Sequence, residues 1–394
     1  MNRRAFLQSA GLASLAFPSV TFGADKKLRV AIIGHTGRGD YGHGLDTVWL
    51  SLAETEIVAV ADANPKGLET ARARLKVERG FADYRQMLEQ SRPDIVAICP
   101  RHADQHHDMA LAAAAAGVRG VYMEKPFCRT PAEADALVAA CQRTSMKLAV
   151  AHRNRYHPVL KTVDKMIADG AIGRLLELRG RGKEDARGGG EDLWVLGSHV
   201  LNLMAYFGGQ PRACAAVLEK DDRPVTKADV QEGREGLGPL AGNKINARFD
   251  MERGVPGYFD SIQNAGKAAA GFGLQLVGNQ GIIDLRCDRQ PLAHLMPGNP
   301  FQPVRELRPW IAISTAGAGK PEPMEQVDAD VAKHIIPARD LMAAIREDRQ
   351  PLCGVRDSAT VVEMISAVFE SHRQGGARVV LPLKNRANAL ASLS

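Results

Sequence analysis

Aromatic residues are scarce in this chain: they make up 5% of its 394 residues, with only three tryptophans. Charge is nearly balanced as well, because 51 lysines and arginines face 45 aspartates and glutamates, giving a formal net charge of +6. Proteins that hold nucleic acid usually carry a strongly basic patch, often interleaved with aromatic side chains that stack on bases. The sequence has no such patch and therefore argues against a nucleic-acid partner.

Long hydrophobic runs are also missing. The apolar stretch near the N-terminus, residues 10–17, is too short to span a bilayer, so we expect no stable membrane anchor. The six cysteines are scattered along the chain, and we expect them to be free thiols. His102, His106 and His107 cluster without the thiolates or carboxylates that would complete a zinc site. We therefore expect no metal.

The N-terminus, in contrast, has the features of an export signal. Arg3 and Arg4 form a twin-arginine pair, an apolar stretch follows, and residues 21–24 offer a small-residue cleavage region. This order is typical of a Tat signal peptide. We expect residues 1–24 to be that signal, cleaved near residues 23–24 after the Tat translocase has carried the protein to the periplasm. A disordered basic tail is the alternative.

A glycine-rich loop follows the first apolar run, residues 28–33, which has the pattern of a buried strand. The loop departs from the dinucleotide fingerprint G-x-G-x-x-G at Thr36, and the neighbouring Gly37 restores room for a pyrophosphate. Gly34 suits the tight turn, and Gly39 suits a helix packed close to the strand. A plain turn is the alternative. The cofactor-binding residues predicted in this loop are Gly34, Thr36, Gly37, Arg38 and Gly39.

Asp62 ends the next apolar run, residues 56–61. An acidic residue at this distance past the loop accepts hydrogen bonds from the ribose hydroxyls of a dinucleotide. Its carboxylate would also repel a 2′-phosphate, so Asp62 favours NAD over NADP. The alternative is a helix cap before Pro65.

Strands and helices then alternate up to residue 151. Helical spacing marks residues 66–79, 84–90, 105–116 and 130–143, and short apolar runs mark residues 94–99, 120–123 and 147–151. This alternation predicts an α/β fold with a doubly wound parallel sheet. We expect residues 25–151 to form an NAD-binding Rossmann domain.

The triplet Glu124-Lys125-Pro126 stands directly after one of these strands. At the carboxyl edge of a parallel sheet, a lysine points into the crevice where such sheets bind ligands. There its ammonium can hydrogen-bond a substrate hydroxyl and favour loss of the hydroxyl proton. A surface lysine in a loop is the alternative.

These residues together resemble the Gfo/Idh/MocA family, named for glucose–fructose oxidoreductase, inositol dehydrogenase and a rhizopine-catabolism protein. The matching stretches lie at residues 33–39, 60–62, 99–100 with His106, 124–126, 155–158, 197–199, 370–375 and 380–383. The resemblance implies a Rossmann domain followed by a C-terminal α/β domain, residues 152–394, with a large, mostly antiparallel open-faced sheet. Such sheets often join subunits, so we expect a homo-oligomer. It also implies a cis Lys125–Pro126 bond.

The resemblance implies the following site. Lys125 and His199 would be catalytic, and the cofactor would also touch Pro100, His106, Glu124, Lys125 and Pro126. Substrate contacts would come from Arg155, Tyr156, Glu191, Asp192 and Asn202.

Two departures from the family pattern bear on that site. The family motif D-x-x-x-H-x-x-D keeps its histidine at His199, but Val195 and Asn202 replace the two aspartates. His199 can still act as a general base, with Glu191, Asp192 and Ser198 as candidates to orient it; a merely buried histidine is the alternative. The segment from Pro100 to His106 is two residues longer than usual, which either shapes substrate choice or is a harmless insertion.

The C-terminal half is less clearly patterned. Helical spacing marks residues 160–169, 196–207, 332–347 and 358–371, and strand-like runs mark residues 174–180, 213–218, 244–249, 273–277 and 281–285. Residues 288–325 hold many prolines and predict a long surface excursion.

The sequence and the resemblance together predict an exported, NAD-dependent oxidoreductase acting on a carbohydrate or polyol. His199 would take the hydroxyl proton while Lys125 stabilises the alkoxide. One alternative is an NAD-dependent glycosidase or lyase that oxidises the sugar transiently and eliminates the glycosidic group. Another is a non-catalytic sensor that binds NAD, which the valine at position 195 favours.

Overall fold

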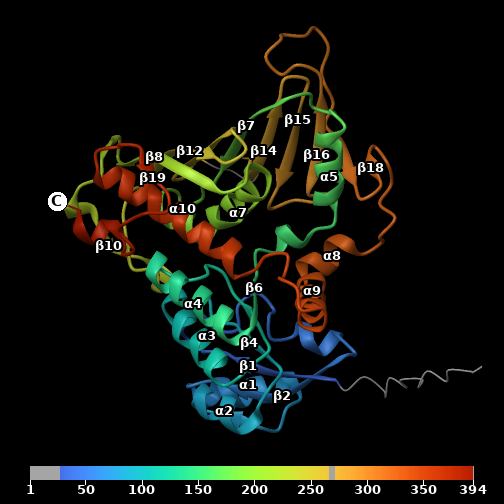
Figure 1. The fold of residues 1–394 in the computed structure, drawn as a ribbon, viewed down its shortest axis with the longest axis vertical. Helices are drawn as coiled ribbons and strands as arrows, with labels where there is room; N and C mark the ends of the chain where they lie inside the picture. Colours follow the sequence, from blue (N-terminus) through green and yellow to red (C-terminus); the bar gives the residue numbers. More distant parts are fainter. Residues whose placement is uncertain (1–26, 266–270, 394) are drawn as a thin grey trace, which may run out of the picture.

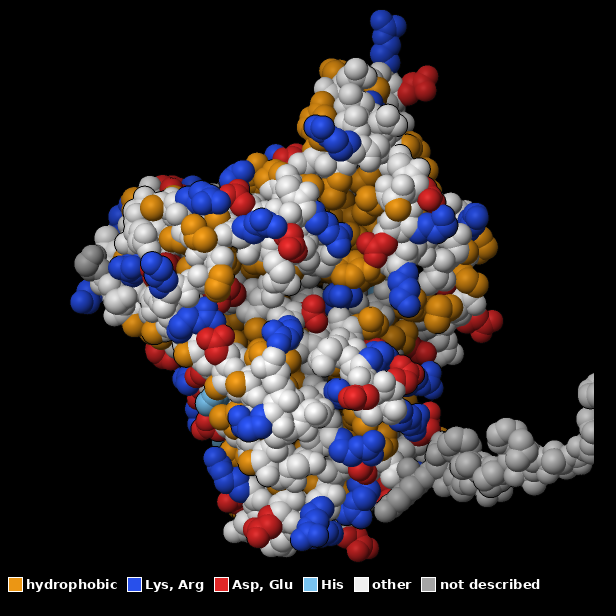
Figure 2. Space-filling model, viewed as in Figure 1, with side chains coloured by type: hydrophobic (Ala, Val, Ile, Leu, Met, Phe, Trp, Pro, Cys, Tyr) orange, Lys and Arg blue, Asp and Glu red, His pale blue; other side chains and the backbone are white. Residues whose placement is uncertain are grey.

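Two β-sheets define the two parts of the molecule, which the computed structural model describes over residues 27–265 and 271–393 (Figure 1). The predicted signal peptide, residues 1–24, lies outside the described residues. Within the described ranges, no helix is long and apolar enough to cross a membrane. Figure 2 shows basic and acidic side chains intermixed over one face of the molecule, as the near-balanced composition requires.

The first sheet has six strands, all parallel, in the order β3-β2-β1-β4-β5-β6. Every residue of β4, β5 and β6 is buried, as expected for strands covered on both faces. The predicted doubly wound α/β fold is therefore confirmed. The strands are β1 (Leu28–Ile33), β2 (Thr55–Ala61), β3 (Gly80–Phe81), β4 (Ile95–Ile98), β5 (Gly120–Met123) and β6 (Lys147–Val150).

Helices α1 (Pro65–Leu75), α2 (Tyr84–Ser91), α3 (His106–Ala115) and α4 (Pro131–Thr144) connect these strands. Side-chain caps fix where they begin: the Asn64 side chain accepts a hydrogen bond from the Gly67 amide, and the Thr130 hydroxyl accepts one from the Glu133 amide. These helices match the predicted ones to within a few residues at each end, apart from the end of α1.

The expected helix after the glycine-rich loop is not formed, and that prediction is wrong. Residues 36–39 and 41–47 are turns, with an isolated bridge between His35 and Asp40, and the short 3₁₀ helix η1 (Val48–Ser51) follows. Gly42 and Gly44 have φ of +61° and +91°, which a right-handed helix cannot contain. Gly39 serves another contact, because a Cβ there would lie 2.5 Å from the Arg101 amide nitrogen. The loop thus packs against the segment after β4.

The second sheet has eleven strands in the order β18-β17-β16-β15-β14-β7-β13-β12-β8-β19, with β9 paired to β8. Only β7 and β13 pair in parallel, so the expected large, mostly antiparallel sheet is confirmed. Its strands are β7 (Leu175–Arg181), β8 (Pro211–Lys220), β9 (Arg223–Pro224), β12 (Lys244–Met251), β13 (Pro256–Ile262), β14 (Gly273–Gly278), β15 (Gly281–Arg286), β16 (Ala293–Pro297), β17 (Ile311–Ser314), β18 (Gly317–Ala318) and β19 (Val379–Val380). A separate pair joins β10 (Gln231–Glu232) to β11 (Pro239–Leu240).

The prediction of a surface excursion over residues 288–325 is wrong, since β16, β17 and β18 lie inside it. These strands are short, and prolines interrupt the segment, so the sequence has no long alternation of apolar and polar residues that would predict them. β16 pairs with β15, β17 with β16 and β18 with β17, so the three strands extend the sheet to its edge, where short strands are common.

Helices cover one face of the second sheet. Phe249 of β12 and Phe259 of β13 are fully buried in the same core as residues of α7 (Gly197–Gly208) and α10 (Val355–Arg373). Arg248 and Arg179 point to the other face and are exposed. The remaining helices are α5 (Val159–Ala168), α6 (Gly190–Val195), α8 (Val327–Ala332) and α9 (Ile335–Arg346).

Helix α9 follows the second sheet in sequence but packs on the first one. Its residues Ala338, Leu341 and Met342 join the buried cluster formed by Val30 and Ile32 of β1. The amide of Val150, at the end of β6, also donates to the carbonyl oxygen of Cys353 at 3.1 Å. These contacts hold the carboxyl edge of the Rossmann sheet against the second domain.

Truncating Leu341 should therefore loosen the junction between the domains. We expect Leu341→Ala to lower the free energy of unfolding by about 2–5 kcal/mol, because the Leu341 side chain is 0% exposed. Leu50→Ala is the matched control, with a side chain 47% exposed, and should cost far less. Urea unfolding of both variants tests this; an equal loss of stability would contradict the assignment of α9 to the Rossmann core.

Candidate active site

Two hollows lie along the carboxyl edge of the Rossmann sheet. The first, of about 410 Å³, opens beside the glycine-rich loop. Its lining includes Gly34, His35, Arg38, Asp62, Asp83, Asp104 and Gln105. At Gly37, which has φ of +82°, a Cβ would meet nothing within 4 Å, so the backbone there is open to a bound group. The position beyond β1 and β2 and the open glycine backbone suit a dinucleotide.

Asp62 lies at the bottom of this hollow and is 1% exposed. Its carboxylate accepts from the Thr36 amide at 3.1 Å, from the Thr36 hydroxyl at 2.6 Å and from the Tyr41 hydroxyl at 2.9 Å. Burial, followed by the charge of Asp62, raises the pKa of Tyr41, so the tyrosine remains a donor. A ribose hydroxyl would therefore have to share or replace these donors, and the role of Asp62 toward NAD stays a prediction.

His106 does not face either hollow. It is fully buried, and its ring nitrogens lie 2.7 Å from the carbonyl oxygens of Pro100 and Pro126. The ring thus joins the loops that follow β4 and β5 and holds the backbone at Pro100 and Pro126. The predicted contact of His106 with the cofactor stays a prediction.

The longer segment between Pro100 and His106 bridges the two domains. Asp104 pairs with Arg38 of the glycine-rich loop, and Arg101 lies 3.9 Å from Glu235 of the second domain. The insertion therefore lines the hollow beside the glycine-rich loop and contacts the C-terminal half.

The second hollow, of about 260 Å³, lies between the domains and contains both predicted catalytic residues. Its lining comprises His43, Glu124, Lys125, Ala151, Arg153, Asn154, Lys183, Leu196, His199, Phe272, Cys287, Asp288 and His334. Lys125 comes from the end of β5 and His199 from α7, so the two domains build this cavity together.

Lys125 is held at both ends. The Lys125–Pro126 bond is cis, as the resemblance implied. The Lys125 amide donates to Glu124 Oε2 at 2.8 Å, and its Nζ donates to the carbonyl oxygen of Val195 at 3.0 Å. Burial lowers the pKa of Lys125 below its usual 10.5, and the charges of Glu124 and Glu235 oppose that shift. The valine at the family's aspartate position thus supplies a backbone acceptor for the lysine.

Glu124 keeps its negative charge although it is buried. Burial raises its pKa, but the hydrogen bond from His43 and the charge of Lys125 outweigh burial, so that the pKa falls to about 2. Both the His43 amide, at 3.0 Å, and the His43 ring, at 2.5 Å, contact Glu124 Oε1. A carboxylate beside Lys125 stabilises the lysine in its ammonium form.

His199 has no carboxylate partner among the described residues. Its Nδ1 is buried with no hydrogen-bond partner in the resolved part of the chain. The ring instead meets the ring of His152 edge to face, with centroids 5.4 Å apart. Burial, followed by the charges of His152 and Lys125, lowers the pKa of His199 well below 6.5, and burial lowers that of His152 to about 3. Both imidazoles are therefore neutral at physiological pH.

Other predicted substrate residues lie outside this cavity. The Arg155 guanidinium stacks on the ring of Tyr206, 3.9 Å from its centroid. The Tyr156 hydroxyl donates to the carbonyl oxygens of Val150 and Cys353 at 3.2 and 3.3 Å. Both residues hold the segment after β6 in place, and neither lines the cavity.

The three acidic or amide candidates near His199 in sequence are also directed elsewhere. Asp192 is fully buried and accepts from the Ser261 hydroxyl at 2.6 Å. Asn202 Nδ2 contacts Cys353 Sγ at 3.4 Å, and Glu191 lines a different hollow beside Arg187 and Arg234. None of the three hydrogen-bonds His199, so sequence proximity did not identify what orients it.

Several cavity residues escaped the sequence analysis, namely His43, Arg153, Asn154, Lys183 and His334. His334 is 2% exposed; its Nδ1 lies 2.6 Å from the Tyr122 hydroxyl, while its Nε2 has no partner within the described chain. Arg153 follows β6 just as Lys125 follows β5, so the carboxyl-edge rule could have found it. His334 had no such signal.

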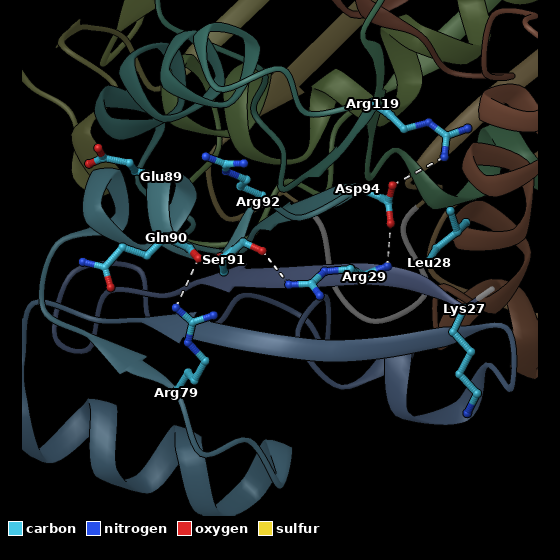
Figure 3. A pocket seen from close by; sticks show the side chains of 10 residues that line it. All are labelled: Lys27, Leu28, Arg29, Arg79, Glu89, Gln90, Ser91, Arg92, Asp94 and Arg119. Atoms are coloured by element: carbon cyan, nitrogen blue, oxygen red, sulfur yellow. Dashed lines mark hydrogen bonds and ion pairs between the residues drawn. The ribbon is translucent and has the colours of Figure 1, made fainter.

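A larger hollow, of about 1050 Å³, lies at the opposite edge of the Rossmann sheet (Figure 3). Asp94 and Arg119 stand there just before β4 and β5, at the amino ends of the strands. The Arg29 guanidinium donates to the carbonyl oxygen of Ser91, and Arg119 pairs with Asp94 (Figure 3). Parallel sheets bind ligands at the carboxyl edge, which favours the cavity between the domains as the candidate site.

This arrangement defines an NAD-binding oxidoreductase. Residues 28–152 match the family model described as the oxidoreductase family with an NAD-binding Rossmann fold, GFO_IDH_MocA. Residues 28–152 are therefore similar to the NAD-binding domain that this family model describes.

Similar proteins carry related descriptions. The chain is 26% identical over 389 residues to D-apiose dehydrogenase of Paraburkholderia graminis, covering 95% of this chain and 96% of that protein. It is 27% identical over 256 residues to levoglucosan dehydrogenase of Pseudarthrobacter phenanthrenivorans, covering 59% and 65% of the two chains. A solved levoglucosan dehydrogenase in complex with NADH and levoglucosan has the same fold, with a TM-score of 0.71, 24% identity, and coverage of 91% and 100%.

Asp62 should set the preference between cofactors. We expect Asp62→Ala to reduce the preference for NAD over NADP, since the change removes the carboxylate that repels a 2′-phosphate. Equilibrium binding of both cofactors measures the ratio. Tyr41→Phe is the control, because it removes one donor to Asp62 and leaves the charge. A wild-type preference for NADP would contradict the assignment.

Proposed function

We propose that this protein oxidises a hydroxyl-bearing carbon of a carbohydrate or polyol, with NAD as the electron acceptor. The observation that carries the proposal is the meeting of Lys125 and His199, from different domains, in one cavity at the carboxyl edge of the Rossmann sheet. The names of the similar sugar dehydrogenases support the substrate class.

The glycine-rich loop, Asp62 and the backbone held by His106 would hold NAD along the crevice. When bound, NAD supplies a nicotinamide ring that accepts a hydride from the substrate carbon. The protein's own groups would handle the substrate oxygen and its proton.

Lys125 would bind the substrate oxygen. Its ammonium already lies in the cavity and donates to the carbonyl oxygen of Val195, which leaves two further N–H donors for a substrate. As the hydroxyl loses its proton, the charge that develops on oxygen is stabilised by this cation in a buried site. Glu124 keeps the lysine charged.

His199 would accept the hydroxyl proton. Burial keeps its imidazole neutral, which is the form that a base requires. Its Nδ1 is unpartnered in the described structure, and His199 lines the cavity, so this nitrogen is available to a substrate hydroxyl or a water. His152 would take the orienting place of the missing aspartate.

These roles predict a bell-shaped pH dependence of kcat/KM. The midpoint of the acid limb should lie below pH 6.5, because His199 is active only when unprotonated and its pKa is lowered. The midpoint of the alkaline limb should lie below pH 10.5, because Lys125 is active only as the ammonium and its pKa is lowered too. His199→Asn should abolish the acid limb and Lys125→Met the alkaline limb. Each should reduce turnover by roughly 10²- to 10⁴-fold.

His107→Asn, half-buried on α3, and Lys161→Met, exposed on α5, are matched controls away from the cavity and should keep the wild-type profile. Near-normal turnover in both catalytic variants on a substrate that the wild type oxidises would refute the assignment.

The elimination route to glycoside cleavage would begin with the same two residues. It differs in the net change: NAD would be regenerated in each cycle, and no NADH would accumulate. Following absorbance of NADH together with release of the glycosidic group separates the two reactions. A sensor would bind NAD but would neither form NADH nor release the glycosidic group.

We propose in addition that the protein acts in the periplasm as a homo-oligomer. The uncovered face of the second sheet would provide the contact between subunits, as the resemblance implied. The twin arginines at the N-terminus support export by the Tat translocase.

Replacing Arg3 and Arg4 by lysine should leave the precursor in the cytoplasm, because the receptor reads the guanidinium pair. Cell fractionation with antibody detection measures this, with the wild type as reference. Undiminished delivery of the double variant to the periplasm would exclude the Tat route.

A further inference from the structure

Arg153 is the least explained charge in the cavity between the domains. It opens the 3₁₀ helix η3 (Arg153–Tyr156), directly after β6, and its side chain is half-buried. No ion pair or hydrogen bond to its guanidinium appears within residues 27–265 and 271–393. A guanidinium that is partly removed from water without a partner is costly, which indicates that a bound anion completes it.

The position of Arg153 places it on the substrate side of the site. In the sheet order β1-β4-β5-β6, the cofactor crevice lies at the β1 end and Lys125 follows β5. Arg153 follows β6, one strand farther from that crevice. An anion at Arg153 would therefore belong to the substrate, and Lys125 would stand between this anion and the glycine-rich loop.

The charge of the cavity points the same way. Lys125, Arg153 and Lys183 contribute three cations to its lining, against the carboxylates of Glu124 and Asp288. Glu124 is engaged by His43 and the Lys125 amide, and Asp288 contacts Arg286 at 3.2 Å. The lining of the cavity thus presents mainly positive charge to a ligand.

Lys183 adds a second cation at the cavity. Its Nζ is 3.8 Å from Asp185 Oδ2 and its side chain is 45% exposed, so it can turn toward a ligand. Asp192 accepts from the backbone amide of Lys183 at 3.3 Å and holds this loop in place. The buried aspartate thereby contributes to the site through the position of Lys183.

We propose that the substrate is a sugar acid whose carboxylate is bound by the guanidinium of Arg153, with Lys183 as the second cation. This inference rests on the proposed function and names its substrate class. The planar fork of arginine matches a carboxylate with two parallel hydrogen bonds. A cavity of about 260 Å³ suits a single sugar unit; sites for larger ligands run from roughly 300 to 1,000 Å³.

Binding a carboxylate at Arg153 would also prepare the base. The charge of Arg153 is one of the causes that lower the pKa of His199. A substrate carboxylate neutralises that charge, so His199 becomes a stronger base when the correct substrate is present. A neutral sugar would not neutralise Arg153, so the charge of Arg153 would continue to lower the pKa of His199.

The test compares sugar acids with neutral sugars in binding to the full protein saturated with NADH. The acids are D-glucuronate, D-galacturonate and D-gluconate, and their neutral counterparts are D-glucose, D-galactose and sorbitol. Isothermal titration calorimetry gives each affinity. We expect at least one acid to bind roughly 10- to 100-fold more tightly than its counterpart, the range for a charge-assisted hydrogen-bonded pair.

Arg153→Gln should remove most of this preference, and Arg153→Lys should retain part of it, since lysine keeps the charge but not the fork. Circular dichroism of the variants checks that they fold. Arg143→Gln is the matched control, because Arg143 is exposed in the last turn of α4 and should not affect the preference. Equal affinity for acids and neutral sugars, or an unchanged preference in Arg153→Gln, would overturn the inference.

Turnover with NAD separates this inference from the function on which it rests. Oxidation of neutral sugars without any preference for acids would uphold the dehydrogenase and refute the carboxylate site. Tight, Arg153-dependent binding of an acid with neither NADH formation nor bond cleavage would uphold the carboxylate site and refute the dehydrogenase.

Discussion

The hydrogen bond from Lys125 Nζ to the carbonyl oxygen of Val195 joins the two domains across the active-site cavity. The bond forms only if the end of β5, which carries Lys125, lies opposite the junction of α6 and α7, where Val195 stands. The packing of α9 on the Rossmann core and the contact between Val150 and Cys353 hold these elements in register. The chemistry assigned to Lys125 and His199 depends on that junction, since neither domain alone contains both groups.

Burial in this cavity acts on each ionisable group differently, and the differences assign the roles. Glu124 stays charged because His43 and Lys125 compensate its burial, whereas His152 and His199 have no anionic partner within the described part of the chain and stay neutral. A cation and a neutral imidazole therefore face the same space, as proton removal from a hydroxyl requires. Replacing the aspartate by Val195 is compatible with this chemistry, because the backbone of Val195 still serves the lysine.

Much of the Rossmann domain could be predicted because its signals are local. Apolar runs such as residues 120–123, and caps such as Thr130 before Pro131, specify their elements without distant partners. The strands β16 to β18 could not be found, since they are short and are defined by pairing in succession outward from β15. Among site residues, Lys125 was found from its place after a strand, but Asp192 was not placed correctly, because its partner Ser261 is distant in sequence and only the tertiary fold brings the two together. His334 was missed because only the tertiary fold brings it to the cavity.

A crystal structure of the protein with NAD and a bound sugar ligand tests the central claim most directly. The account predicts that one substrate hydroxyl lies within hydrogen-bond reach, about 2.6–3.2 Å, of both Lys125 Nζ and a ring nitrogen of His199. The carbon bearing that hydroxyl should face nicotinamide C4. A ligand whose hydroxyls contact neither residue, or a nicotinamide ring directed away from the cavity between the domains, would contradict it.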